Sequence, residues 1–322
     1  MLWAWCSCKK MANSARILGL DFSRAVAIML VVVGSLGFLP ETNLLQGGDD
    51  WVFPFFLFCM GLAIPFSHKS TKGKIIRAMA MFGVGLLLNV FTQMAWSQYP
   101  SFVLSVDFGS VRIMNVLQRI AICYFVCAVA LPRPKKSVLI ALFIAYSLLL
   151  ALDFGLPNQI DLLILKGHTY TPLGDPEGLL STVGAVCSTM FGQMIGNILR
   201  KSEGKLNVGR WAAFGLLCLP ASFLLGMVIP IDKPVWSTSF VLYSSGFAIL
   251  FFCALHYVLD IKRWGSPVAQ FIGILGANTI LVYTVSYLVY RSMILQQSLL
   301  YVVAYLLLWV VALNLLKIRV RL

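Results

Sequence analysis

Four carboxylates (Asp49, Asp50, Asp175 and Glu177) and one histidine are the residues that could accept a proton in group-transfer chemistry. Asp50 directly follows Asp49 at the start of an apolar run, and His168 lies seven residues before Asp175. Histidine is the usual general base because its pKa lies near neutrality. A carboxylate can serve if burial or a like-charged neighbour raises its pKa, and Asp49 is such a neighbour of Asp50. Adjacent carboxylates and loop histidines also commonly just face water, so both interpretations stay open for these candidate catalytic residues.

The composition predicts that these residues sit on a polytopic, all-α integral membrane bundle. The 322 residues are 60% apolar and only 11% charged, with a mean hydropathy of +0.88. Soluble domains carry about a quarter charged residues, whereas apolar runs of about 20 residues predict membrane helices. We expect about ten transmembrane helices, at residues 17–39, 51–67, 77–97, 114–131, 137–155, 179–199, 211–230, 238–259, 269–290 and 297–316.

The distribution of charge predicts the orientation of these spans. Nineteen of the 25 basic residues fall on one side, and nine of the twelve acids fall on the other. The positive-inside rule then places both termini in the cytoplasm, with Asp50, His168 and Asp175 on the outer side. His68 and His256 fall on the basic side, away from an acceptor outside the cell. We expect a cytoplasmic segment at 1–16, a transmembrane domain at 17–316 and a cytoplasmic tail at 317–322.

Two further features exclude other classes of protein. The net charge of +13 is explained by basic cytoplasmic loops, so we expect no nucleic-acid partner. Six cysteines lie within apolar spans, where a free thiol behaves as a small hydrophobe. We therefore expect no disulfide framework and no metal site. These six are Cys59, Cys123, Cys127, Cys187, Cys218 and Cys253.

Two arginines fall inside predicted spans, where a charge is expensive and commonly functional. Arg24 follows Asp21 by one helical turn, so the two share a helix face. They could form a functional site or a purely structural ion pair. Arg119 follows Asn115 and Gln118, which favours a polar cavity over an arginine that only snorkels to the headgroups. Arg24 and Arg119 are both candidate binding residues.

The longest predicted loop, residues 156–178, ends in an acidic turn. Asp175, Pro176, Glu177 and Gly178 precede an apolar span, and acids beside a proline are also typical of a helix start. A loop of this length is uncommon without a function. Further polar or aromatic residues near the outer ends of spans, or within them, are Lys233, Trp236, Ser239 and Asn278.

Six segments together resemble signatures of the heparan-alpha-glucosaminide N-acetyltransferase family and its bacterial relatives. They are LDFSRAVAIMLVVV, DDWVFPFFLFCMGLAI, VRIMNVLQRIAICYF, GDPEGLLSTVGA, DKPVWSTSFVLYSSG and GANTILVYTVSY. The resemblance covers residues 16 to 290, and VLQRIA and DPEGLLST are its specific parts. It implies a transmembrane acyltransferase that moves an acetyl group from cytosolic acetyl-CoA to an amino sugar across the membrane.

The resemblance also implies site residues. Beside the catalytic candidates, the substrate-binding set is Asp21, Arg24, Ser35, Asp49, Gln118, Arg119, Glu177, Lys233, Trp236, Ser239 and Asn278. The chain departs from the family at Ala25, where the family has glycine, and at Ser35, where it has asparagine. The loop LPETNLLQGGDD lacks the histidine that the family carries ahead of the position of Asp50.

The sequence thus predicts an acyltransferase of a bacterial inner membrane, with acetyl-CoA or another acyl-CoA as donor substrate and an amino sugar or glycan as acceptor. Its partners would be these substrates and the lipid bilayer, and a homo-oligomer is possible. Two alternatives stay open. A degenerate relative could bind or sense a ligand without turnover, and a transporter could use Arg24 and Arg119 for an anionic solute.

Overall fold

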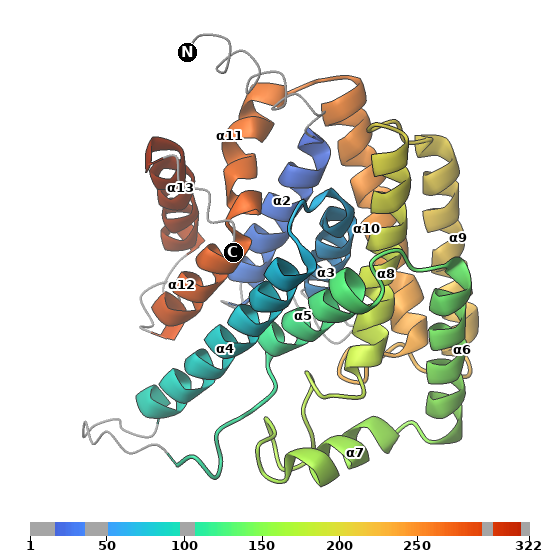
Figure 1. Ribbon diagram of the computed structural model, residues 1–322, viewed down its shortest axis with the longest axis vertical. Helices are drawn as coiled ribbons and strands as arrows, with labels where there is room; N and C mark the ends of the chain where they lie inside the picture. Colours follow the sequence, from blue (N-terminus) through green and yellow to red (C-terminus); the bar gives the residue numbers. More distant parts are fainter. Residues whose placement is uncertain (1–16, 36–50, 97–106, 292–298, 317–322) are drawn as a thin grey trace.

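The protein is built from α-helices, as the apolar runs predict. The computed structural model describes residues 17–35, 51–96, 107–291 and 299–316 (Figure 1). Its first half contains α2 (Leu18–Ser35), α3 (Val52–Ala63), α4 (Thr71–Trp96), α5 (Val116–Phe125), α6 (Lys136–Leu152) and α7 (Leu156–Leu165). Its second half contains α8 (Thr182–Lys201), α9 (Val208–Gly226), α10 (Thr238–His256), α11 (Ser266–Ala277), α12 (Thr279–Arg291) and α13 (Leu299–Leu316).

Short helical segments of other types extend three of these helices. A 3₁₀ turn, η1 (Ile64–Phe66), follows α3, and π-helical turns follow α5 and α10 as η2 (Val126–Ala130) and η3 (Tyr257–Ile261). Within the described ranges, strand-like pairing is limited to one isolated bridge between Thr171 and Gly174.

Several helices are long and apolar enough to cross a membrane, which confirms the prediction of an all-α membrane protein. Four qualify alone, at Thr71–Gln93, Thr182–Lys201, Val208–Gly226 and Thr238–Ile261. Two bent pairs, α6 with α7 and α11 with α12, raise the number to six if each pair is one span. Ten spans and cytoplasmic termini stay predictions, because residues 1–16 and 317–322 lie outside the described part of the chain.

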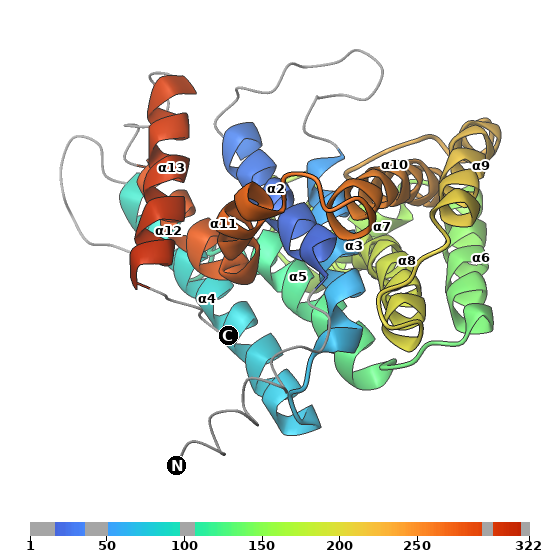
Figure 2. The same cartoon turned by 90° about the horizontal axis from the view of Figure 1, so that it is seen from above.

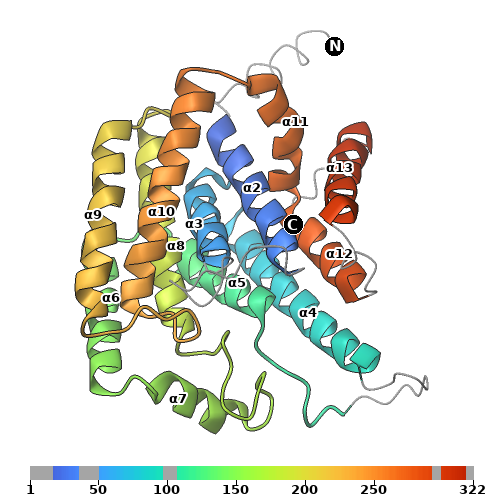
Figure 3. The same cartoon turned by 180° about the vertical axis from the view of Figure 1, so that it is seen from behind.

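The structure differs from the predicted elements in two places. Residues 156–165, expected in a loop, form α7, which turns by 94° from α6 and lies across the end of the bundle (Figure 3). Pro157 opens this helix, where its fixed φ is favourable. The expected span 269–290 is broken by 71° at Asn278. The Asn278 side chain donates to the carbonyl of Ile274 at 3.0 Å, an example of a short polar side chain competing with the helical backbone.

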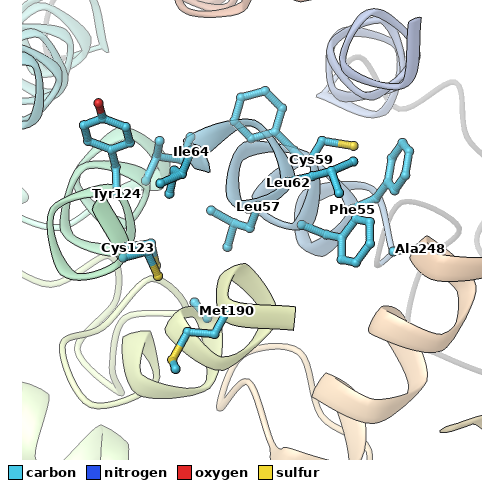
Figure 4. Close-up of a cluster of buried hydrophobic side chains, with 14 of the residues drawn as sticks. Phe55, Leu57, Cys59, Leu62, Ile64, Cys123, Tyr124, Met190 and Ala248 are labelled. Carbon is cyan, nitrogen blue, oxygen red and sulfur yellow. The ribbon is translucent and has the colours of Figure 1, made fainter. Parts of the chain in front are cut away.

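The core is centred on α3 and α8, with α2, α5 and α10 around them. Figure 4 shows apolar side chains of α3, such as Phe55 and Leu62, beside Cys123 of α5, Met190 of α8 and Ala248 of α10. Viewed from above, α3 and α8 lie inside, while α6 and α9 lie at one edge (Figure 2).

Glycines allow α3 and α8 to approach at backbone distance. A Cβ added to Gly192 of α8 would lie 2.0 Å from the carbonyl oxygen of Phe58, and one added to Gly61 of α3 would lie 2.0 Å from that of Thr189. These positions exclude any larger side chain unless the helices separate. Small residues at such crossings are typical of membrane helix pairs.

The glycine contact gives a direct test of this packing. We expect Gly192→Ala to lower the free energy of unfolding by about 1–3 kcal/mol, the usual cost of overpacking a core. Thermal unfolding in detergent would measure it. Gly83→Ala is the matched control, because a Cβ there meets nothing within 4 Å, and alanine favours helix. Equal stability of the Gly192 variant and wild type would contradict the close crossing.

Candidate functional site

Two asparagines fix the segment that leads into α5. The Asn115 side chain caps α5 by accepting the N–H of Leu117 at 2.7 Å, and it donates to the side chain of Asn89 on α4. Asn89 in turn donates to the backbone carbonyl of Arg112 at 2.7 Å. These bonds hold the backbone of Arg112 against α4, just before the start of α5; Figure 1 shows α4 and α5 side by side.

Arg112 binds both acids of the Asp-Pro-Glu-Gly turn. Its Nε donates to Asp175 Oδ2 at 2.9 Å, while its Nη2 donates to Asp175 Oδ1 and to Glu177. Its guanidinium also lies over the Tyr170 ring, 4.6 Å from the centroid. Burial opposes the charge of Arg112, but the two carboxylates outweigh it and raise the pKa of the guanidinium above its ordinary value. The turn is therefore held to α5 by charge-assisted hydrogen bonds.

Asp175 is fully occupied by these contacts. Besides Arg112, Asp175 accepts the backbone N–H groups of Tyr170 at 3.0 Å and Glu177 at 2.9 Å. Its side chain has no exposed surface, whereas Arg112 keeps 23% and Glu177 18% of theirs. The expectation that the turn caps the following helix is wrong, since α8 begins only at Thr182. The acids bind an arginine instead.

Arg119 lies in the interior of the bundle and binds the backbone of the Asp-Pro-Glu-Gly turn. It is 1% exposed, so it does not reach the headgroups. Its Nη2 donates to the carbonyl of Pro176 at 2.8 Å and to the hydroxyl of Ser181. Its guanidinium carbon lies 4.8 Å from the centre of the Trp236 ring, a distance typical of a cation–π interaction. The predicted polar neighbours Asn115 and Gln118 contact α4 instead, and a cavity beside Arg119 stays a prediction.

Trp236 completes this cluster from the loop before α10. It is 1% exposed and adopts a φ of 53°, which is uncommon for a bulky residue. Its indole N–H donates to Ser188 of α8 at 3.1 Å, and its ring meets Phe53 of α3 edge-on at 5.3 Å. Gly184 leaves room for it, since a Cβ there would lie 2.2 Å from the Trp236 carbonyl. We call Arg112, Arg119, Asp175, Glu177 and Trp236 the two-arginine cluster.

Asp161 of α7 supports the turn from outside the cluster. It is fully buried, and its Oδ1 accepts the N–H of Leu179 at 2.8 Å. Its Oδ2 has no hydrogen-bond partner among the described residues. Burial raises the pKa of this carboxyl, against the backbone N–H groups of Leu179 and Leu180, which lower it. Asp161 therefore binds the turn in a place where its ionised form is less favourable than in water.

His168 contacts the backbone on either side of Arg112. Its Nδ1 lies 2.8 Å from the carbonyl oxygen of Val111. A carbonyl only accepts, so Nδ1 carries the proton and a neutral ring has its lone pair on Nε2. The backbone N–H of Ile113 also donates to the carbonyl of His168 at 3.0 Å. The ring is thus partly buried, and it is oriented by the backbone of the residue that precedes Arg112.

The other predicted binding residues lie in separate places. Gln118 packs into α4 against Gly85. Ser239 donates to the carbonyl of Pro230 at 3.0 Å, which closes the loop before α10. Asp21 and Arg24 lie on α2, where Gly276 of α11 leaves room for the backbone and side chain of that helix.

Lys233 precedes Trp236 in its loop, and Asn278 lies on another element. The carbonyl of Lys233 accepts the N–H of Trp236 at 3.0 Å, while Asn278 lies at the break between α11 and α12. Ser35 is the last residue of α2. Asp49 and Asp50 lie outside the described residues. The structure therefore brings Arg119, Asp175, Glu177 and Trp236 together from the predicted set.

Sequence reasoning missed Arg112 and Asp161 as site residues. Arg112 is one of only four basic residues predicted on the outer side, where the turn carries two acids. With so few cations on that side, Arg112 could have been predicted as a partner of these acids. Among the described residues, no group of three or more His, Cys, Asp or Glu side chains is placed to hold a metal ion.

The fold and cluster define a polytopic helical membrane protein in which a buried and a partly exposed arginine bind the Asp-Pro-Glu-Gly turn. The chain matches no protein-family model. It is 26% identical to heparan-alpha-glucosaminide N-acetyltransferase of Mus musculus over 84% of this chain and 53% of that protein. It is 26% identical to the Homo sapiens protein of that name over 83% of this chain and 52% of that protein. The chain is related to these N-acetyltransferases at the level of the family, and spans about half their length.

The Arg112 pair predicts a marked loss of stability on removal of one partner. We expect Arg112→Gln to lower the free energy of unfolding by about 2–3 kcal/mol, because Asp175 would stay buried without its cation. Thermal unfolding in detergent would measure the loss. The double variant Arg112→Gln with Asp175→Asn should regain part of it, since no buried charge then lacks a partner. A single variant as stable as wild type would contradict the pairing.

Asp161 predicts a dependence of stability on pH. Its folded pKa is raised, so the stability that it contributes is complete below its unfolded pKa of about 4. That contribution falls as the pH rises from there through the folded pKa. Asp161→Asn does not titrate and keeps an oxygen for the N–H of Leu179. We expect the variant to gain stability relative to wild type as the pH rises from about 4 to 7, measured by thermal unfolding. A difference independent of pH would contradict the assignment.

Proposed function

We propose that this protein is a membrane acyltransferase that moves an acetyl group from cytosolic acyl-CoA to an amino sugar or glycan on the outer face. The main support for this proposal is the similarity to N-acetyltransferases over 84% of the chain. Two segments that carry the resemblance, VRIMNVLQRIAICYF and GDPEGLLSTVGA, supply four of the five residues of the two-arginine cluster. Charge distribution supports a bacterial inner membrane with both termini in the cytoplasm.

The reaction needs a base on the acceptor side. The amine nitrogen of the acceptor forms a bond to the acyl carbon, the carbon–sulfur bond of the thioester breaks, and the thiolate of CoA leaves. The proton of the attacking amine passes to the base. Donors must meanwhile stabilise the oxyanion that forms on the carbonyl.

The contacts of the cluster distinguish the catalytic candidates. Asp175 accepts four hydrogen bonds, so we assign it a positioning role. His168 offers Nε2 from an oriented ring, and Asp50 precedes α3, whose Phe53 contacts Trp236. His168 and Asp50 are therefore the two proposed bases. The partly exposed Glu177 and Arg112, with Lys233, would contact the acceptor.

One observation favours a second candidate, a relative that binds or senses a ligand without turnover. Asp175 and Glu177 are both committed to Arg112, and the loop before α3 contains no histidine. Acids paired in this way are suited to fixing a loop around a ligand, whether or not a reaction follows.

Transfer of label would distinguish the two functions. Purified protein would be incubated with acetyl-labelled acetyl-CoA and glucosamine-type acceptors, and labelled acceptor counted. We expect wild type to transfer the label, and loss of the base to lower turnover by about 10²–10⁴-fold. Asp50→Asn and His168→Ala compare the two bases, and the rate should fall at low pH as the base is protonated.

The chain offers a matched histidine control. His68 is exposed in the loop before α4, so His68→Ala should leave turnover unchanged. Binding of acetyl-CoA without transfer by wild type would support the ligand-binding relative. Absence of acetyl-CoA binding would contradict both functions and leave only a shared fold.

A further inference from the structure

A groove on the flank of the bundle lies between α6, α8 and α9. Its volume is about 730 Å³, within the range of ligand pockets. Figure 2 shows α6 and α9 at the same edge of the bundle, with α8 inside them. Its lining includes none of the residues of the two-arginine cluster. The proposed reaction thus leaves this groove without a role.

The walls of the groove are apolar and aromatic. Phe143 of α6, Phe191 of α8 and Phe214 of α9 line it, and Phe214 is 39% exposed. The flanking helices α6 and α9 also carry many exposed apolar side chains, such as Leu148 and Leu217. In a membrane these surfaces face acyl chains rather than water, so the groove is open to lipid tails.

Three cations line the same groove. Lys136 begins α6, Lys205 lies in the turn before α9, and Arg210 lies in the first turn of α9. All three residues are exposed. Glu203 is the one acid between residues 200 and 210, and it is not among the lining residues. Each cation also belongs to a loop that the charge distribution assigns to the cytoplasmic side.

We propose that this groove binds an anionic phospholipid of the surrounding leaflet. The acyl chains would lie along Phe143, Phe191 and Phe214, and the phosphate would meet the cations at the ends of α6 and α9. Arginine and lysine are the residues that recognise phosphate. Basic pockets between membrane helices on the cytoplasmic side are suited to anionic headgroups. A zwitterionic lipid has the same tails but lacks the net charge that the three cations match.

Trp211 makes this binding measurable, because it also lines the groove. Full-length protein in neutral detergent would be titrated with phosphatidylglycerol whose acyl chains carry bromine, and the quenching of tryptophan fluorescence recorded. Phosphatidylcholine with the same brominated chains is the comparison. We expect half-maximal quenching at a lower mole fraction of phosphatidylglycerol. Trp211→Phe should remove the part of the quenching that is selective for the anionic lipid.

Charge variants test the headgroup contact. We expect Lys136→Gln, Lys205→Gln and Arg210→Gln each to weaken phosphatidylglycerol binding by about fivefold, the effect of one cation near an anionic membrane surface. Their effect on phosphatidylcholine should be absent. The matched control changes three exposed lysines outside the groove lining, Lys72, Lys201 and Lys262, to glutamine. Elution of every variant as a single species would show that the fold is kept.

Three results would overturn the proposal. Equal quenching by both lipids would show only general contact with acyl chains. An equal loss in the control variant would show a general effect of surface charge. Displacement of the brominated phosphatidylglycerol by a long-chain acyl-CoA at a far lower concentration would assign the groove to an acyl donor. None of these results depends on whether the protein transfers acetyl groups.

Discussion

The buried guanidinium of Arg119 is the constraint on which the packing around the Asp-Pro-Glu-Gly turn depends. A charge removed from water destabilises a fold unless hydrogen bonds and polarisable groups replace its hydration. Arg119 obtains these from carbonyls of the Asp-Pro-Glu-Gly turn, from Ser181 and from the face of Trp236. The turn can supply its carbonyls only when folded inward, and Arg112 holds it there through Asp175 and Glu177. One arginine binds the backbone of the turn and the other binds its acids.

Other features of the fold follow from placing Trp236 beneath this guanidinium. The loop before α10 adopts a left-handed φ at Trp236, and Gly184 of α8 admits its carbonyl at a distance that a Cβ would prevent. Phe53 then packs on the ring from α3. Glycines at the crossing of α3 and α8 set the depth at which these helices meet. The position of Arg119 is thus coupled to the packing of α3 against α8. A substitution at the crossing of these helices should shift the Asp-Pro-Glu-Gly turn.

Sequence reasoning predicted the helical membrane class and the polar stripe ending in Arg119, because apolar run length and buried charge are local signals. It could not find the partner of Asp175, which is 63 residues away in Arg112 and is identified only by folding. The break at Asn278 was missed because a single amide in an apolar run leaves its periodicity unchanged. Residues 156–165 were assigned to a loop because they lie between two predicted spans, yet they form α7, whose buried Asp161 accepts the N–H of Leu179.

The paired state of the cluster also bears on how a base could act nearby. A carboxylate with both oxygens hydrogen-bonded and its charge neutralised by arginine is poorly suited to accept a proton, so Asp175 is better suited to hold geometry than to react. If Asp175 holds the geometry, the position of His168 becomes important for the choice of base. The carbonyl of Val111 binds its ring one residue before Arg112, so the pairing that fixes the turn also fixes the imidazole. A base held by backbone needs no acidic partner to define its tautomer. Loosening the Arg112 pair would then disturb His168 through the backbone of Val111.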